Sequence, residues 1–424
     1  MTHTPESSRH LGIFISMFPE MHETFILREL VALERRGVPF TVYSLQHPRD
    51  PITLEDAKRL SSERTVYADL VSFAAFMAFV GTLIRHPIKL LGAMATFAWV
   101  GRDRPLDVIK GLGALPLILQ FGSHARRQGI THLHGHWANV PTTACWFLQR
   151  VMGFNWSAAI HGEDIFSANR FLPYKLDQAT FSVVCSGYFC KHLKTEIGVE
   201  RPESIHLNYH GLDPKVMALS ATTAFNMRAA SDPFRIVSIG RLVPTKGHDT
   251  LFRACAAILA RTDTPLTIDL IGAGPDHDRL QALARELGIE QQVNFVGALP
   301  FESVLESLVQ ANAFCLAPRM IPGHPPDGIP NVIAEAMALR VPIVTTAVSA
   351  IPELVENGES GLLAPDGDTD AFAQAIETLM NDPQRAQALS DAGYDKVGIM
   401  FNQEANIDDL LSLFHEHNVL PRAA

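Results

Sequence analysis

Two acidic side chains and a proline-rich loop stand close together in the second half of the chain. Asp327 ends the loop, and Glu335 follows eight positions later inside an expected helix. Pro330 is expected in the first turn of that helix, where its missing N–H costs nothing. The nearby amides of Gly328 and Ile329 would face open space and suit an anion. Amides for a diphosphate and carboxylates for sugar hydroxyls together suit a sugar nucleotide.

A pair of cations follows another expected strand. The strand ends at Gly240, Arg241 comes next, and Lys246 stands five positions further on, before the next expected helix. Arginine offers a planar fork and lysine a point charge, a good combination for a diphosphate that gains charge as it leaves. The glycine that follows, Gly247, comes after the lysine, so this is not a Walker A loop. Solvated surface charge is the alternative interpretation.

Candidate residues also follow two further expected strands. His161 can donate to a phosphate or a sugar hydroxyl, and Asp164 can accept from an acceptor hydroxyl. A histidine satisfied within the core is the alternative for His161. Gly297 ends a strand whose backbone groups are expected to be free to face a nucleobase. Ligands of open parallel sheets bind outside the carboxyl ends of the strands, which is where each of these clusters falls.

Alternating histidines at positions 132, 134 and 136 resemble the spacing of metal ligands. Leu133 and Gly135, however, fit a strand that runs into a loop, and no acidic residue is near in the sequence. Zinc sites are usually completed by further cysteine, histidine or acidic ligands. We therefore expect no metal here.

The elements that must position these residues alternate between short apolar runs and amphipathic helices. Strands are expected at 11–16, 40–44, 131–134, 157–160, 181–185, 235–239, 266–271, 293–296, 313–317, 342–345 and 361–364. Helices are expected between them, for example at 23–36 and 138–152. This alternation predicts an α/β fold with two parallel sheets. The polar stretch 213–233 is the best boundary between two domains.

Length and composition agree with a globular protein of more than one domain. The chain has 424 residues, 47% of them hydrophobic and 19% charged, which predicts roughly two or three domains. A net charge of −10 argues against nucleic acid as a partner. The odd number of cysteines and their wide spacing predict reduced, buried thiols. The polar N-terminus leads us to expect no signal peptide.

An apolar segment spans residues 70–100, interrupted by Arg85 and Lys89. Neither of its two runs reaches the ~18–20 residues that cross a bilayer. The first interpretation is a pair of helices packed into the first domain. The second is a hydrophobic surface, edged by these cations and by Arg102 and Arg104, that rests on a membrane face.

These motifs together resemble glycosyltransferase family 4, the retaining sugar-nucleotide-dependent enzymes of GT-B architecture. Residues 327–335 resemble its Glu-x7-Glu element, with Asp327 in place of the first glutamate. Residues 240–247 resemble its diphosphate-binding pair, and residues 161–164 its first-domain histidine motif. Within the family, the segments FPEMHETF and HLHGHWAN look most like bacterial exopolysaccharide and colanic-acid-type transferases.

The resemblance implies two Rossmann-like domains whose parallel sheets face a central cleft. Residues 1–213 would bind the acceptor and residues 214–400 the nucleotide sugar. Residues 401–424 would form a C-terminal helical segment that packs back on the first domain.

The implied reaction moves a hexose, with retention, from a UDP- or GDP-sugar to a glycan or lipid-linked acceptor in bacterial polysaccharide or glycolipid biosynthesis. No metal or other cofactor is implied. The expected catalytic residues are His161, Asp164, Asp327 and Glu335. The expected donor-binding residues are Gly240, Arg241, Lys246, Gly297, Gly328, Ile329, Pro330, Asn331 and Glu335.

Arg241 and Lys246 would hold the leaving diphosphate, Glu335 the ribose hydroxyls and Asp327 the donor hexose. The expected location is the cytoplasm, with peripheral contact at the inner face of the cytoplasmic membrane. Two alternatives stay open: another GT-B enzyme, such as a sugar-nucleotide epimerase or a phosphorylase, and a catalytically silent nucleotide-sugar-binding protein.

Overall fold

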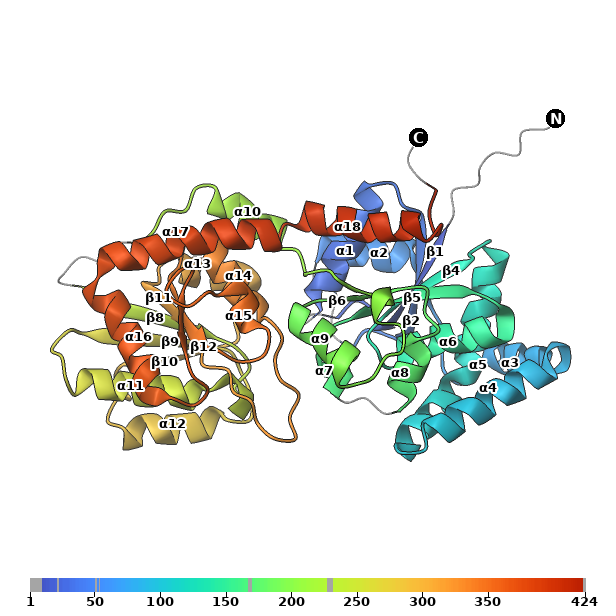
Figure 1. The fold of residues 1–424 in the computed structure, drawn as a ribbon, viewed down its shortest axis with the longest axis horizontal. Helices are drawn as coiled ribbons and strands as arrows, with labels where there is room; N and C mark the ends of the chain where they lie inside the picture. Colours follow the sequence, from blue (N-terminus) through green and yellow to red (C-terminus); the bar gives the residue numbers. More distant parts are fainter. Residues whose placement is uncertain are drawn as a thin grey trace. The chain divides into compact units, whose positions relative to one another are not determined.

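The chain divides into two compact units, each built on one sheet (Figure 1). Unit 1 comprises residues 1–211 and 404–424, and unit 2 comprises residues 212–403. The computed structural model describes residues 10–20, 23–49, 52, 54–166, 170–226 and 232–421.

The sheet of unit 1 is parallel throughout the described residues. Its strand order is β3-β2-β1-β4-β5-β6-β7. The strands are β1 (Leu11–Met17), β2 (Phe40–Gln46), β3 (Thr65–Tyr67), β4 (His132–His136), β5 (Asn155–Ile160), β6 (Ser182–Val184) and β7 (Ile205–Leu207). The two outermost strands, β3 and β7, are three-residue elements that the sequence analysis did not predict.

Helices flank this sheet, and the last one comes from the end of the chain. They are α1 (Thr24–Arg35), α2 (Glu55–Glu63), α3 (Phe73–Arg85), α4 (Pro87–Val100), α5 (Pro105–Arg127), α6 (Val140–Met152), α7 (Glu163–Phe166), α8 (Phe171–Leu176), α9 (Gly187–Thr195) and α18 (Gln403–Glu416). Helix α18 enters the core of unit 1 through Ile407, Leu410 and Phe414.

Unit 2 repeats the plan with a second parallel sheet of order β10-β9-β8-β11-β12-β13. The strands are β8 (Phe234–Ile239), β9 (Leu266–Ile271), β10 (Val293–Gly297), β11 (Ala313–Cys315), β12 (Ile343–Thr346) and β13 (Leu362–Ala364). The helices are α10 (Pro214–Ser220), α11 (His248–Leu259), α12 (His277–Glu286), α13 (Phe301–Val309), α14 (Asn331–Ala338), α15 (Ile351–Leu354), α16 (Thr369–Asn381) and α17 (Pro383–Met400). The predicted α/β class with two parallel sheets is confirmed.

Strand order reverses once in each sheet, between β1 and β4 in unit 1 and between β8 and β11 in unit 2. Loops that leave such neighbouring strands diverge to opposite faces, which opens a crevice at the carboxyl edge of the sheet. The predicted site residues of unit 1, His161 and Asp164, follow β5, the neighbour of β4. In unit 2 they follow β8 and β11, apart from Gly297, which ends β10. Topology therefore places most of the predicted residues of unit 2 at its strand reversal and those of unit 1 one strand away from the reversal.

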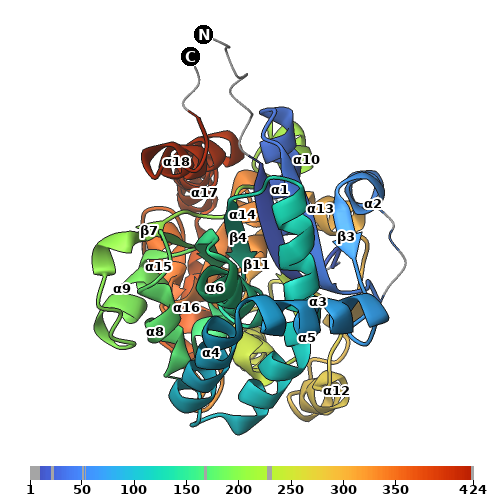
Figure 2. The same cartoon turned by 90° about the vertical axis from the view of Figure 1, so that its right-hand side faces the viewer.

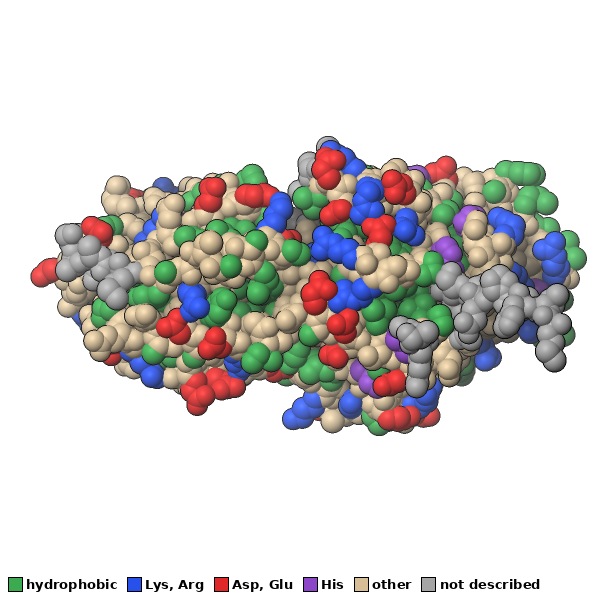
Figure 3. Space-filling model, turned by 90° about the horizontal axis from the view of Figure 1, so that it is seen from above, with side chains coloured by type: hydrophobic (Ala, Val, Ile, Leu, Met, Phe, Trp, Pro, Cys, Tyr) green, Lys and Arg blue, Asp and Glu red, His purple; other side chains and the backbone are tan. Residues whose placement is uncertain are grey.

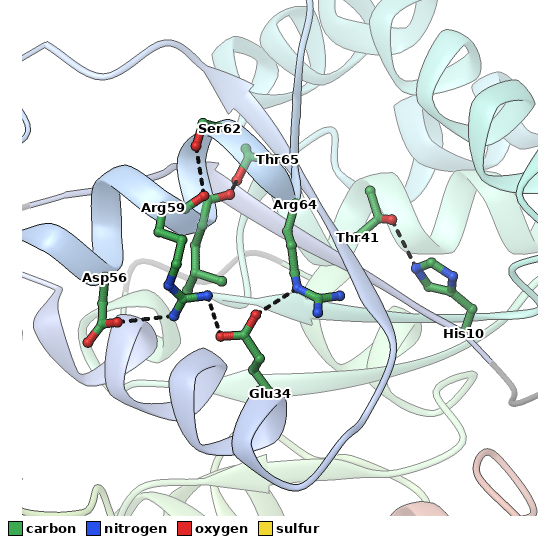
Figure 4. A network of polar contacts seen from close by, with 9 residues as sticks. His10, Glu34, Thr41, Asp56, Arg59, Ser62, Arg64 and Thr65 are labelled. Atoms are coloured by element: carbon green, nitrogen blue, oxygen red, sulfur yellow. Dashed lines mark hydrogen bonds and ion pairs between the residues drawn. The ribbon is translucent and has the colours of Figure 1, made fainter.

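Helix α1 is fastened to its neighbours by one carboxylate (Figure 4). Glu34 accepts hydrogen bonds from Arg59 on α2 at 2.6 Å and from Arg64 at 2.9 Å. Arg36, just past the helix, pairs at 2.8 Å with Asp408 on α18. These contacts fix the register of α1 over the sheet, which matters because α1 also carries Glu29 into the crevice of unit 1.

Helices α3, α4 and α5 lie together on one side of unit 1 (Figure 2). By length and apolar composition alone, α5 is long enough to cross a membrane, and α3 with α4 passes only as a pair bent by 110°. The second half of α5 belongs to the core of unit 1 through Leu115, Ile118 and Phe121. The predicted pair of helices in the 70–100 segment is present as α3 and α4.

Glycines let the strand-end loops of unit 2 approach backbone to backbone. A Cβ on Gly272 would lie 2.0 Å from the carbonyl oxygen of Gly240, and a Cβ on Gly247 would lie 1.7 Å from that of Ala317. Both glycines have positive φ angles, of 143° and 64°. The sequence GAGP after β9 is therefore a tight turn against the β8 loop.

Replacing Gly272 by alanine should destabilise unit 2 by about 3 kcal/mol or more, because backbone strain and a collision with a carbonyl act together. Gly288→Ala is the control, since Gly288 also has a positive φ, of 71°, but open space around it. The control should lose only about 1–2 kcal/mol. Urea denaturation measures both, and equal losses would contradict the argument.

Candidate functional site

The centre of the site in unit 2 is an ion pair between two predicted residues. Lys246 Nζ lies 2.9 Å from Asp327 Oδ2, and both side chains are largely withdrawn from solvent, with 13% and 26% exposed. The aliphatic stem of Lys246 crosses Gly240, where a Cβ would stand 3.4 Å from the lysine Cδ. The structure thus brings together one predicted cation, one predicted acid and the glycine at the end of β8.

Backbone contacts hold the two loops that carry this pair. The amide of Arg319 donates to the carbonyl of Thr245 at 2.9 Å, directly beside Lys246. The amide of Met320 donates to Asp366 at 3.0 Å, which fixes the start of the proline-rich loop. The loop after β11 is therefore tied to the loop after β8, and Asp327 meets Lys246 because both loops begin at the strand reversal.

The helix after the loop begins as predicted, with a shift of one residue. Pro330 is the residue before α14, Asn331 is the first helical residue, and the Pro330 carbonyl accepts from Ile333 at 2.9 Å. Within the described part of the chain, the amides of Gly328 and Ile329 bond to no protein group. They supply the unpaired donors that an anion at this turn requires.

Glu335 lies one turn further along α14 and is buried, with 9% of its surface exposed. Arg241, by contrast, has an exposed side chain. Its carbonyl accepts from His248 Nε2 at 3.3 Å, and His248 Nδ1 lies 3.3 Å from Ser238 Oγ. His248 therefore supports the loop that carries Arg241 from a buried position. Burial lowers the pKa of His248 to about 4, so it is neutral at pH 7.

Gly297 differs from its predicted use in one respect. It lies at the end of β10 with a φ angle of 81°, and its carbonyl accepts from the amide of Gly272 at 2.9 Å. That carbonyl is used within the fold rather than left free for a nucleobase, because the tight turn after β9 needs an acceptor there.

In unit 1 the predicted histidine lies inside a chain of imidazoles. His161 Nε2 is 3.2 Å from His136 Nδ1, and His161 Nδ1 is 3.0 Å from His210 Nε2. Phe25 on α1 stacks on His210 at 4.2 Å between ring centroids. Burial, and then the neighbouring histidines, hold the pKa of His161 well below its usual value. His161 follows a strand end, which suits a donor to a phosphate or sugar hydroxyl. Other side chains also satisfy it, which suits a core histidine, so both interpretations have support.

Asp164 and a lysine that the sequence analysis missed clamp the loop after β4. The Asp164 carboxylate accepts from the amides of Ala138 and of Gly162, the latter at 3.0 Å. Lys175 donates to the Ala138 carbonyl at 2.6 Å and to Thr143 Oγ1 at 3.0 Å. Asp164 is buried, with 5% exposed, and burial raises its pKa to about 6. The structure thus shows Asp164 holding backbone amides from a buried position.

The alternating histidines also differ from expectation. His136 is the last residue of β4 rather than part of a loop. An acid does lie next to it, because Glu29 Oε1 on α1 is 3.2 Å from His136 Nε2. Glu29 and His136 are more than a hundred positions apart in the sequence, so no local spacing could reveal this contact.

Comparison with known proteins finds similarity to glycosyltransferases, centred on unit 2. Residues 221–396 match the family model described as "Glycosyl transferases group 1". The chain is 30% identical over 213 residues to a putative colanic acid biosynthesis glycosyltransferase, WcaL, of Salmonella typhimurium, covering 50% of this chain and 51% of that protein. It is 36% identical over 160 residues to a GDP-mannose-dependent alpha-(1-6)-phosphatidylinositol monomannoside mannosyltransferase of Mycolicibacterium smegmatis, covering 37% and 41%. The chain spans about half the length of the curated relatives it matches.

Solved structures match the whole chain in fold. A glycosyltransferase from Rickettsia africae superposes with a TM-score of 0.71 at 12% identity, covering 98% of this chain and all of that one. Anabaena Alr3699/HepE in complex with UDP superposes with a TM-score of 0.69 at 16% identity, covering 96% and 100%. At such identities the likeness concerns the fold alone.

Lowering the pH should reduce the folding stability of unit 2 through His248. Its pKa of about 4 lies below the ordinary 6.5, so the unfolded chain takes up the proton first and stability falls as pH drops from 6.5 towards 4. Between pH 7.5 and 5 this contribution is about 2 kcal/mol. His248→Gln should remove that part of the pH dependence in calorimetry. The same substitution at exposed His324 should keep it, and identical pH profiles for both variants would contradict the assignment.

Proposed function

We propose that this protein is a retaining glycosyltransferase, because residues 221–396 match the family model described as "Glycosyl transferases group 1" and the chain has the two-sheet GT-B fold. It would move a hexose from a nucleotide sugar to a glycan or lipid-linked acceptor. The observation that carries the proposal is the Lys246–Asp327 pair at the strand reversal of unit 2. Relatives named for colanic acid and amylovoran biosynthesis support a role in bacterial polysaccharide assembly.

The geometry of unit 2 suits a nucleoside diphosphate. Lys246 supplies a fixed, partly desolvated cation, which favours the negative charge that develops on a leaving diphosphate. The unpaired amides of Gly328 and Ile329 supply donors nearby in the chain, and Arg241 supplies an exposed guanidinium fork. Glu335 on α14 would accept from the ribose hydroxyls, and Asp327 would contact the donor hexose.

Lys246 has two anionic partners in this scheme, Asp327 and the diphosphate. A lysine held by a carboxylate keeps its charge and its position before the substrate arrives, which is the preorganisation that electrostatic catalysis requires. Retention would follow a front-face course, in which the leaving phosphate helps to deprotonate the acceptor hydroxyl. No metal or other cofactor takes part in this proposed transfer.

The donor is best identified by a binding and hydrolysis screen over UDP-, GDP- and ADP-sugars. One relative is named as GDP-mannose-dependent, and one solved neighbour is a complex with UDP, so both nucleotide classes belong in the screen. Transfer or slow hydrolysis supports the proposal. Epimerised donor, or sugar phosphate formed from a glycan, would favour another GT-B enzyme, and binding without turnover would favour a silent binding protein.

Lys246→Ala should lower kcat by about 10²–10³, because it removes one charge-assisted contact to the developing phosphate charge. Steady-state kinetics with the donor found in the screen measures this. Lys396→Ala is the matched control, since Lys396 also forms an ion pair in unit 2, with Glu356, and should keep wild-type turnover. An unchanged kcat for Lys246→Ala would refute the assigned role.

For the acceptor we propose a lipid-linked sugar reached from the inner face of the cytoplasmic membrane. Eleven of the seventeen exposed large apolar side chains among the described residues lie between Leu70 and Ile109. Exposed cations adjoin them, at Arg85, Lys89 and Arg102. Figure 3 shows hydrophobic and basic side chains side by side on the surface of unit 1. Apolar area with a basic rim suits an anionic lipid surface.

Ile88→Ser and Trp99→Ser should each weaken binding to phosphatidylglycerol vesicles by about tenfold, because each removes a large side chain from the lipid contact. These side chains are 87% and 69% exposed, so the fold should be unaffected. Ile399→Ser on α17, 78% exposed, is the matched control and should bind as wild type. Co-sedimentation measures all three. Equal binding by every variant would contradict the membrane contact.

A further inference from the structure

Three buried ligand atoms converge in the crevice of unit 1. The side chains of Glu29, His134 and His136 each present one, and these atoms all lie within 4.8 Å of one another. His134 and His136 are 1% and 0% exposed. The cluster joins helix α1 to strand β4, and the proposed transfer makes no use of it.

None of these three atoms has a hydrogen-bond partner among the described residues. Oε1 of Glu29, Nε2 of His134 and Nε2 of His136 are each buried and unsatisfied. The glutamate and His136 atoms are 3.2 Å apart and can pair when His136 is protonated, whereas His134 Nε2 has no such partner among the described residues. Buried polar atoms left without partners are costly and rare, so three such atoms facing one another call for a ligand.

The spacing suits a small cation. Bonds of about 2.0–2.2 Å to nitrogen and oxygen in tetrahedral geometry place two ligand atoms about 3.3 Å apart. The Glu29–His136 separation of 3.2 Å matches this value. The wider pairs of the cluster would be drawn inward by an ion that all three atoms share.

The Nδ1 atoms of His134 and His136 are within hydrogen-bond distance of other side chains, as is usual for histidines that bind metals. His134 Nδ1 lies 2.7 Å from Ser157 Oγ, and His136 Nδ1 lies 3.2 Å from His161 Nε2. A histidine that ligates a metal donates its other N–H to such an outer partner, which fixes its tautomer and ring orientation. Both histidines therefore point an Nε2 lone pair into the cluster.

We propose that Glu29, His134 and His136 bind a divalent transition-metal ion of the zinc class, with water completing its coordination. Two imidazoles and one carboxylate form a donor set that zinc favours. A hard ion such as Mg²⁺, which prefers oxygen ligands, is a poor fit. No acidic residue lies near the histidines in the sequence, so we expected no metal there; the carboxylate comes instead from α1.

The ion would position the other histidines, because its ligand His136 begins a chain of imidazoles that continues through His161 to His210. Coordination at Nε2 leaves the proton of His136 on Nδ1, which then donates to His161 Nε2. His161 in turn carries its proton on Nδ1 and donates to His210 Nε2. Binding of one ion at β4 thereby selects a single tautomer for three histidines.

The test uses the full chain, stripped with a chelator and titrated with Zn²⁺ against a chromophoric competitor. Wild type should bind one Zn²⁺ per chain and no Mg²⁺ in a parallel titration. Glu29→Gln keeps the shape of the side chain and should weaken Zn²⁺ affinity by more than ~100-fold. Ser157→Ala should weaken it by about 10–100-fold, the usual effect of losing an outer partner.

Glu34→Gln is the matched control on the same helix, because Glu34 pairs with arginines and points away from the cluster. It should bind Zn²⁺ as wild type does. Thermal unfolding without metal verifies that every variant is folded. Absence of stoichiometric Zn²⁺ on the wild type, or equal affinity in wild type and Glu29→Gln, would overturn the proposal.

Discussion

The site in unit 2 depends on a backbone contact that no side chain could replace. The loop after β9 touches the loop after β8 so closely that Gly272 has no room for a Cβ against the Gly240 carbonyl, and the segment after β11 approaches the β8 loop so closely that Gly247 has none against the Ala317 carbonyl. This contact fixes the path of residues 240–247, lays the stem of Lys246 over Gly240 and leaves its ammonium facing Asp327. The ion pair is thus a consequence of how two parallel strands and their glycines meet at a strand reversal.

In unit 1, buried polar side chains rather than glycines hold the loop after β4. Asp164 and Lys175 take the amide and the carbonyl of Ala138. They support Trp137, which has a φ angle of 76°, a conformation that a non-glycine residue adopts only when its surroundings impose it. Burial raises the pKa of Asp164 to about 6 and lowers that of Lys175 to about 7, so the clamp is built from groups whose charge is itself costly to bury.

Sequence reasoning succeeded where the signal was local. Apolar runs bounded by glycine or proline predicted the sheets because burial on both faces demands such runs, and 266–271 matches β9 at both ends. It missed β3 and β7, because these edge strands, TVY and IHL, are mostly only partly buried and so carry no apolar run. It missed Glu29 and Lys175 for a different reason: each acts on a residue far away in the chain, and the packing of α1 and α8 on the sheet decides those contacts.

Asp327 shows why residue type and geometry must be considered together. In the sequence it was an oddity, an aspartate where the resembling family carries glutamate, and its expected partner was the donor hexose. In the structure its carboxylate is 2.9 Å from Lys246. An aspartate has one methylene fewer, so its carboxylate stays close to the backbone of its own loop, whose start is tied to the β8 loop through Arg319 and Thr245. The short side chain of Asp327 and the lysine stem that crosses Gly240 together set this ion pair.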